Sequence, residues 1–84
     1  MERTIIMNDI TEILRDALML GEIEIHPESQ LEAFGVDSMA LVDLTLKLEE
    51  KYDITIDDFV LVNIKTLNEA VDAIMRILHN REQS

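Results

Sequence analysis

The sequence of 84 residues predicts an all-α, four-helix bundle with three longer helices, one short third helix and a long first loop. Three segments carry apolar residues at spacings of three and four, which is typical of a helix that packs one face on a core. Both glycines and the only proline fall in residues 21–37, so this segment is expected to form the loop. A chain of this length forms one domain at most, and we expect a single domain over residues 1–84.

The first helix is expected over residues 4–20. Its apolar face follows the pattern i, i+3, i+4, i+7 and i+8 and consists of Ile10, Ile13, Leu14, Ala17 and Leu18. Gly21 is suited to end this helix, because glycine readily adopts the left-handed conformation that often follows a helix. In the loop of residues 21–37, four side chains are expected to contact the core: Ile23, Ile25, Leu31 and Phe34.

The second helix is expected to start at Asp37 or Ser38 and to end near Tyr52. Its core stripe is predicted to be Leu41, Leu44, Leu48 and Tyr52. The next apolar stretch, residues 54–62, alternates at first like a strand, but a lone strand has nothing to pair with. We therefore predict a short helix over residues 58–62, capped by Asp57 or Asp58.

The last helix opens with a capping box formed by Thr66 and Glu69, in which each side chain accepts the other residue's free backbone N–H. Its apolar face is predicted to be Leu67, Ala70, Val71, Ile74, Ile77 and Leu78. The residues that follow are polar, so the chain is expected to fray from about residue 79.

The chain is strongly acidic, with 18 acidic residues, seven basic residues and a net charge of −11. This charge argues against nucleic acid and anionic membranes as partners, because both need a cationic surface. It favours basic protein surfaces, which attract an acidic partner over distance. There is no cysteine, and no apolar run approaches the ~20 residues that span a bilayer. We expect a soluble, cytoplasmic monomer.

No set of residues forms a self-contained catalytic site. Serine catalysis needs a base that is oriented by a third group, and the two histidines, His26 and His79, have no such setting. The stretch DITIDD, residues 53–58, begins like a calcium loop but lacks the required glycine and final glutamate. A weak site for a divalent cation remains an alternative at Glu49, Asp53 and Asp57.

The stretch GVDSM, residues 35–39, resembles the signature of the phosphopantetheine-dependent carrier proteins, the acyl carrier proteins and peptidyl carrier domains. That signature is a Gly-x-Asp-Ser-Leu-like run at the start of the second helix. Two further segments match at the family's spacing. LEEKYDITI, residues 48–56, looks like Leu-Glu-Glu-x-Phe-Gly-Ile-x-Ile, and IKTLNEAVDAI, residues 64–74, looks like Ile-x-Thr-Val/Leu-x-Asp-Ala-x-x-x-Ile. The resemblance covers nearly the whole chain.

In that family a separate transferase moves 4′-phosphopantetheine from coenzyme A to the serine hydroxyl. The thiol of this arm then holds acyl or aminoacyl groups as thioesters. The resemblance implies that Ser38 is the attachment residue, that Asp37 helps to orient it, and that the protein is a carrier and not an enzyme. The alternative is that Ser38 serves only as an N-cap. A helix start suits a phosphate, because free N–H groups and the positive end of the helix dipole lie there.

The resemblance also implies a surface for partner enzymes on the second helix. Apolar contacts are assigned to Met39, Val42 and Leu46, and ion pairs with basic surfaces to Asp43 and Glu49. For Val42 and Leu46, burial in the core is an equal alternative. The implied partners are a phosphopantetheinyl transferase, a loading ligase or transferase, and downstream synthase or tailoring enzymes.

Three departures from the fatty-acid type bear on the pathway. Ala40 replaces a frequent acid, Asp57 replaces a proline, and the third helix, FVLV at residues 59–62, is more apolar than usual. They favour a specialised pathway of polyketide, non-ribosomal peptide or modified amino-acid synthesis. Primary fatty-acid synthesis is the alternative. An alternative of another class is an unmodified acidic helical adaptor that binds a basic protein.

Overall fold

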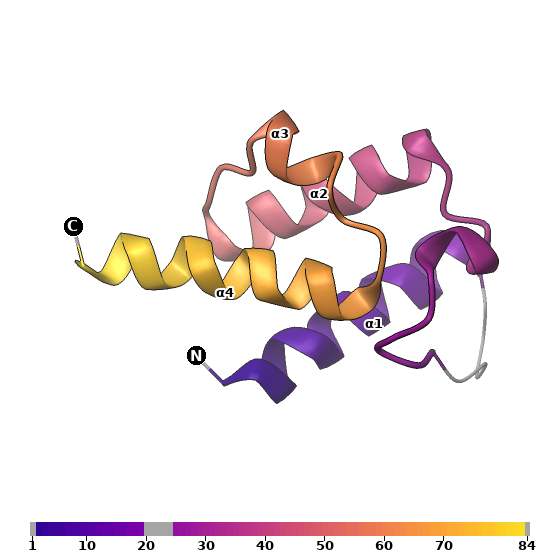
Figure 1. Ribbon diagram of the computed structural model, residues 1–84, viewed down its shortest axis with the longest axis horizontal. Coiled ribbons are helices and arrows are strands. Elements are labelled where there is room, and N and C mark those ends of the chain that lie inside the picture. The colour runs from indigo at the N-terminus through magenta and orange to yellow at the C-terminus, as the bar shows by residue number, and fades with distance from the viewer. Residues whose placement is uncertain (1, 20–24, 84) are drawn as a thin grey trace.

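The computed structural model describes residues 2–19 and 25–83, and it shows the predicted all-α fold with three long helices and one short one. The elements are α1 (Arg3–Leu18), the 3-10 turn η1 (Leu31–Phe34), α2 (Ser38–Tyr52), α3 (Asp58–Leu61) and α4 (Leu67–Gln83). Figure 1 shows that α2 and α4 run in one direction and α1 in the other. The described part measures 38 × 24 × 21 Å.

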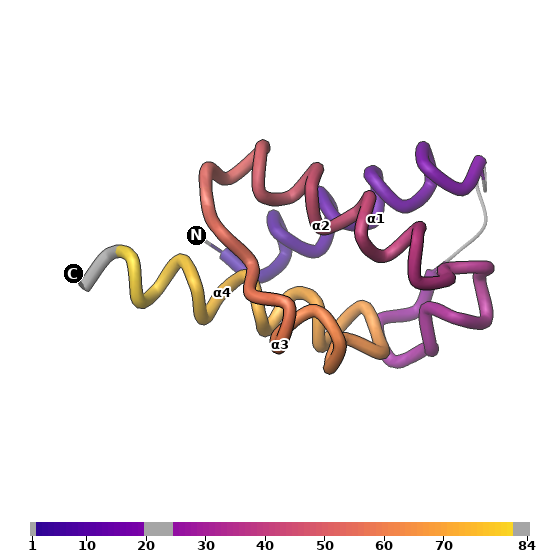
Figure 2. Tube along the Cα trace, turned by 90° about the horizontal axis from the view of Figure 1, so that it is seen from above, coloured from indigo at the N-terminus to yellow at the C-terminus, as the bar shows by residue number. Residues whose placement is uncertain are grey.

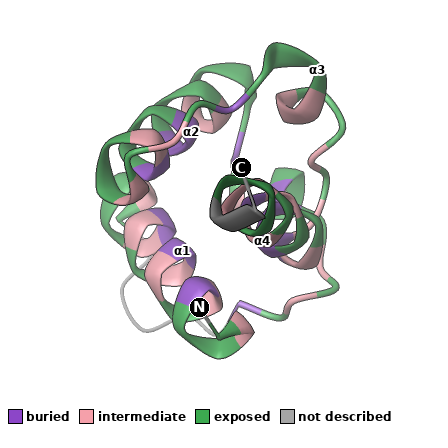
Figure 3. Ribbon diagram, turned by 90° about the vertical axis from the view of Figure 1, so that its left-hand side faces the viewer, coloured by how far each residue is buried: buried purple, intermediate pink, exposed green. Residues whose placement is uncertain are grey.

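Helix α1 packs on α4 and α2. Its buried residues are Ile6, Ile10 and Leu14, and the buried sides of α1, α2 and α4 face one another in Figure 3. Of the predicted face, Ile10 and Leu14 are buried and Ile13 and Leu18 are half-buried against the core. Ala17 is exposed, contrary to the prediction, and the completely buried Ile6 was not predicted. The helix ends at Leu18, and Met19 follows in the left-handed conformation with φ of 54°. Residues 20–24, with the expected stop at Gly21 and the anchor Ile23, lie outside the described residues.

The first loop is held to the core by Ile25 and Leu31, as predicted, and by Val36, which was not predicted. Phe34 is half-buried against the same core. An isolated antiparallel bridge joins Gln30 to Thr66, just before α4. Figure 2 shows the loop segment beside the start of α4. The bridge thus connects two segments that lie far apart in the sequence.

Helix α2 begins at Ser38 and ends at Tyr52, as predicted. Leu44 and Leu48 are buried, while Leu41 and Tyr52 are half-buried at the edge of the core. Thr45 is buried as well, and its hydroxyl donates a hydrogen bond of 2.8 Å to the carbonyl oxygen of Leu41. The apolar pattern does not include Thr45, because threonine is polar. Its burial is possible because the hydroxyl forms a hydrogen bond within the helix.

The predicted short helix is present as α3, over Asp58–Leu61, which excludes a strand at these residues. Asp57 occupies the N-cap position, but its side chain makes no capping hydrogen bond, so that part of the prediction is wrong. Phe59 of α3 and Val62, which directly follows the helix, are exposed. Within the described residues, no helix is long and apolar enough to cross a membrane.

The capping box at the start of α4 is present with one change. The hydroxyl of Thr66 accepts the N–H of Glu69 at 3.2 Å, as predicted. The Glu69 carboxylate accepts the N–H of Lys65 at 3.1 Å, one residue before the expected donor. Helix α4 continues to Gln83, through the segment for which fraying was expected. The Arg81 guanidinium donates to the carbonyl oxygens of Tyr52 at 2.9 Å and Asp53 at 2.7 Å.

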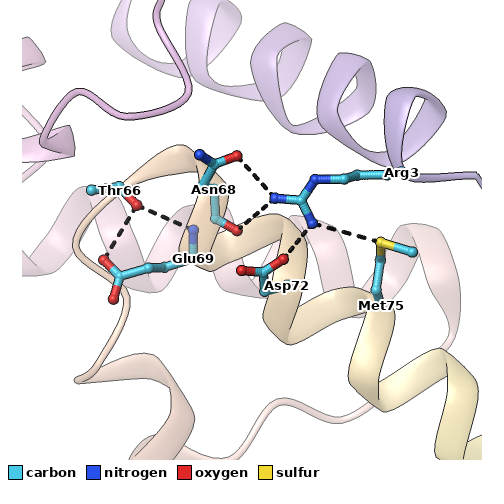
Figure 4. A network of polar contacts seen from close by, with 6 residues as sticks. All are labelled: Arg3, Thr66, Asn68, Glu69, Asp72 and Met75. Atoms are coloured by element: carbon cyan, nitrogen blue, oxygen red, sulfur yellow. Dashed lines mark hydrogen bonds and ion pairs between the residues drawn. The ribbon is translucent and has the colours of Figure 1, made fainter.

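Two sets of polar contacts attach α1 to the other long helices, in addition to the contact of Arg81 with α2. Figure 4 shows Arg3 of α1 with Asn68, Asp72 and Met75 of α4, and its guanidinium lies 2.9 Å from the Asn68 side-chain oxygen. In the second connection, the hydroxyl of Tyr52 donates to Asp9 of α1. The two connections fix α1 against α4 and α2 respectively.

Candidate functional site

The turn from Gly35 to Asp37 determines where Ser38 points. Gly35 has φ of 89°, a left-handed conformation that a residue with a side chain rarely adopts. Its N–H donates to the carbonyl oxygen of Glu32 at 3.0 Å, which closes η1. Val36 is buried and anchors the turn. Ser38 follows as the first residue of α2, with its side chain exposed.

Asp37, and not Ser38, caps the helix. The Asp37 carboxylate accepts the N–H of Ala40 at 2.8 Å, and its carbonyl oxygen accepts the N–H of Leu41 at 2.9 Å. Within the described residues, the N–H groups of Ser38 and Met39 and the hydroxyl of Ser38 have no hydrogen-bond partner. The alternative of Ser38 as an N-cap is thus wrong. The hydroxyl is free for chemistry, and two N–H groups are available to an anion beside it.

A hollow of about 470 Å³ opens next to Ser38. Its walls come from η1, the start of α2 and the segment before α4, because the backbone of Leu31 is bonded to the carbonyl oxygen of Lys65 at 2.9 Å. The lining residues are Gln30, Leu31, Glu32, Gly35, Val36, Asp37, Ser38, Leu41, Ile64 and Lys65. The sequence interpretation missed Val36, Ile64 and Lys65, since this wall depends on a contact between distant segments.

The residues assigned to a partner surface lie on the outside of α2. Met39 is 82% exposed, Val42 46% and Leu46 58%, which excludes the alternative that Val42 and Leu46 form part of the core. Asp43 is exposed and pairs with Lys47 at 3.3 Å, one turn further along the helix. The structure therefore presents three apolar side chains and a carboxylate on the exposed side of the helix that begins with Ser38.

Glu49 has a role within the fold. Its carboxylate accepts the N–H of Ile56 at 2.8 Å and so holds the segment that leads to α3. Asp53 pairs with Arg81 at 3.5 Å, so two of the carboxylates weighed as a cation site are already engaged. Among the residues that the structure describes, no three His, Cys, Asp or Glu side chains gather as a metal site requires.

The arrangement matches a known type of site. The family model for the phosphopantetheine attachment site matches residues 8–74. An acyl carrier protein of Coprothermobacter proteolyticus is 37% identical over 82 residues, which are 96% of this chain and 100% of that protein. The chain belongs to the acyl carrier protein family. The predicted resemblance is thereby confirmed, and with it the prediction of a carrier type and not an enzyme type.

Solved acyl carrier proteins have the same fold. The crystal structure of the Thermotoga maritima acyl carrier protein superposes with a TM-score of 0.85 at 21% identity, over 95% of this chain and 94% of that chain. A type-II acyl carrier protein of Streptomyces verticillus, involved in bleomycin biosynthesis, gives a TM-score of 0.76 at 25% identity, with 90% and 89% covered. The match to chloroplastic acyl carrier protein 4 of Arabidopsis thaliana covers 53% of that longer protein.

The described residues fit the cofactor that the family carries. A phosphopantetheine attachment site needs a reachable hydroxyl and groups that tolerate a phosphate beside it. The exposed Ser38 provides the hydroxyl, and the unpaired N–H groups of Ser38 and Met39 provide hydrogen-bond donors at the positive end of α2. The capping by Asp37 keeps this helix start in place without occupying those donors.

Proposed function

We propose that 4′-phosphopantetheine is attached to Ser38 and that the protein carries acyl or aminoacyl intermediates as thioesters on this arm. The observation that carries the proposal is the exposed, unbonded Ser38 hydroxyl at the start of α2, inside the segment matched by the attachment-site model. The bound group supplies a terminal thiol, which a chain without cysteine does not have.

The residues of the chain prepare the hydroxyl for a transferase. During attachment the Ser38 oxygen forms a bond to the pantetheine-side phosphorus of coenzyme A and gives up its proton to a base of the transferase. The pyrophosphate bond breaks, and adenosine 3′,5′-bisphosphate leaves with the bridging oxygen. The free N–H groups of Ser38 and Met39 stabilise the negative charge of the resulting phosphodiester. Asp37 holds the helix start and thereby orients the serine. Chemistry on the cargo falls to the partner enzymes.

The partner surface is proposed to be the exposed side of α2. Met39, Val42 and Leu46 provide apolar contacts next to the arm, and Asp43 provides a carboxylate for a basic surface. The net charge of −11 supports attraction of basic partners over distance. The partners would be a phosphopantetheinyl transferase, a loading enzyme, and synthase or tailoring enzymes. Glu49 remains in this set as a prediction, although Ile56 already occupies one of its oxygens.

For the pathway we favour specialised biosynthesis, such as polyketide, non-ribosomal peptide or modified amino-acid synthesis. We also propose that the carrier is monomeric and cytoplasmic. Ala40 supports the specialised pathway, because it removes an ionic contact that fatty-acid synthase enzymes would meet two residues after Ser38. The similarity to the bleomycin-pathway carrier is in line with it. Rapid malonyl loading and elongation by fatty-acid synthase enzymes would contradict the proposal and favour primary fatty-acid synthesis.

Intact-mass spectrometry tests the attachment. The protein is incubated with coenzyme A and a promiscuous phosphopantetheinyl transferase, and its mass should rise by one phosphopantetheine. Ser38→Ala should abolish the gain, whereas Ser29→Ala, the control in the first loop, should leave it unchanged. If several transferases produce no gain, the attachment is wrong and the acidic helical adaptor becomes the better function.

A further inference from the structure

Most basic residues in this acidic chain already have a partner. Within the described residues, Arg3 pairs with Asp72, Lys47 with Asp43, Lys51 with Asp9 and Arg81 with Asp53. The side chains of Lys65 and Arg76 make no ion pair or hydrogen bond there. In the described part of the chain these two side chains therefore remain available to an added anion.

Lys65 is the only basic residue among those that line the hollow beside Ser38. Its backbone is held on both sides: the carbonyl oxygen accepts the N–H of Leu31 at 2.9 Å, and its own N–H donates to Glu69 at 3.1 Å. The fold thus fixes the base of an exposed lysine side chain at the wall of the hollow. Its long stem and three donors let the ammonium group reach an anion within the hollow.

A phosphate group attached to Ser38 would lie close to acidic side chains. Glu32 and Asp37 line the same hollow, and the Asp37 carboxylate is already engaged with Ala40. A phosphodiester adds one more negative charge, which the two free N–H groups of α2 balance only in part. A cation on the opposite segment would complete the balance, because opposite charges at short range favour each other.

We infer that Lys65 is a positioning residue that pairs with the phosphodiester of the arm on Ser38, and so directs the arm across the hollow. The inference rests on the proposed attachment at Ser38. Both the segment before α4, through Lys65, and the start of α2, through its free N–H groups, would then hold the phosphate of the arm. The ligand is defined by its chemistry, a phosphodiester monoanion attached to this chain.

The test compares apo and modified protein by nuclear magnetic resonance. Lys65→Met removes the charge and keeps most of the stem, Lys65→Arg keeps the charge, and Arg76→Met is the matched control. Arg76 is also unpaired in the described part of the chain, but it lines a different hollow, between α3 and α4. Each protein is modified with coenzyme A and transferase, and its intact mass is checked first. Amide shifts of residues 64–66 and the phosphorus shift are then recorded.

In the natural sequence, modification should move the amide signals of Ile64 and Thr66, which precede and follow Lys65. Because an exposed ion pair shifts an equilibrium by roughly two- to fivefold, these movements should fall at least about twofold in Lys65→Met. Lys65→Arg and Arg76→Met should keep them. Salt of about 1 M, which shortens the screening length to about 3 Å, should reduce the movements and alter the phosphorus shift only where residue 65 is charged.

The outcomes separate the two proposals. If the mass rises but Lys65→Met behaves like the natural sequence, or salt has no effect, the role of Lys65 is wrong and the attachment stands. If no phosphopantetheine is added to any protein, both are wrong. Because the readout is the difference between apo and modified forms of one protein, a general structural effect of the substitution cancels.

Discussion

At the start of α2, two adjacent residues divide two tasks. The Asp37 carboxylate bonds to the N–H of Ala40 and fixes the helix start. The Ser38 hydroxyl has no hydrogen-bond partner within the described residues and remains exposed. A serine that capped the helix would have to break its own bond before reacting. Because Asp37 caps the helix instead, the Ser38 hydroxyl can react without first losing a hydrogen bond.

Asp43 is expected to act in partner binding and not in folding. Its pair with Lys47 is exposed on one helix, where such pairs contribute about 0.3–0.5 kcal/mol. Asp43→Lys should therefore weaken binding to the transferase several-fold and change the unfolding midpoint little. Titration calorimetry and thermal unfolding check this. A comparable loss in both would make Asp43 a structural residue, and Glu50→Lys, also exposed on α2, serves as the control.

At the scale of the element, α2 depends on the two leucines it buries. Leu48 is 3% exposed and lies in the common core with Ile10 and Val71. Leu48→Ala should cost roughly 2–5 kcal/mol of unfolding free energy, because it removes apolar contacts and leaves a cavity. Denaturant unfolding measures the change. Leu46→Ala, on the exposed side of the same helix, should cost well under half as much, and equal costs would show that the core is misassigned.

The elements could be predicted from the sequence because their apolar spacing is local. Pattern and capping residues gave α2 its correct ends at Ser38 and Tyr52. The face of α1 was predicted only in part, because Ile6 lies in an apolar stretch in which its neighbour Ile5 is exposed. The hollow at Ser38 could not be predicted, since its wall at Lys65 depends on the bridge between Gln30 and Thr66. Pairing between residues so far apart in the sequence leaves no pattern in the residues around either of them.

At the scale of the molecule, polar connections determine how the long helices meet. Arg3 ties the start of α1 to α4 through Asn68 and Asp72 (Figure 4). Asp9 ties the same helix to the end of α2 through the hydroxyl of Tyr52 and, at 3.9 Å, through the ammonium of Lys51. The end of α2 is also held by Arg81 of α4. The carboxyl-terminal end of α2 is therefore the place where all three long helices are joined.

This junction makes stability sensitive to alkaline pH. Burial, followed by the hydrogen bond to Asp9 and its negative charge, raises the pKa of Tyr52 above the ordinary value of 10.0. A raised pKa means that the folded protein keeps the phenolic proton after the unfolded chain has lost it. The contribution to stability is thus fully present below pH 10 and is lost progressively as the pH rises above it.

We therefore expect the unfolding free energy to fall above pH 10.0, and to fall less steeply in Tyr52→Phe, which has no proton to lose. Tyr52 is the only tyrosine and there is no tryptophan, so phenolate absorbance reports on this residue alone. In the folded protein its titration should begin well above pH 10.0, whereas in denaturant it should be centred near that value. An ordinary titration midpoint in the folded protein would show that the hydroxyl is not held by Asp9, and would remove this junction from the account of how α1 and α2 are joined.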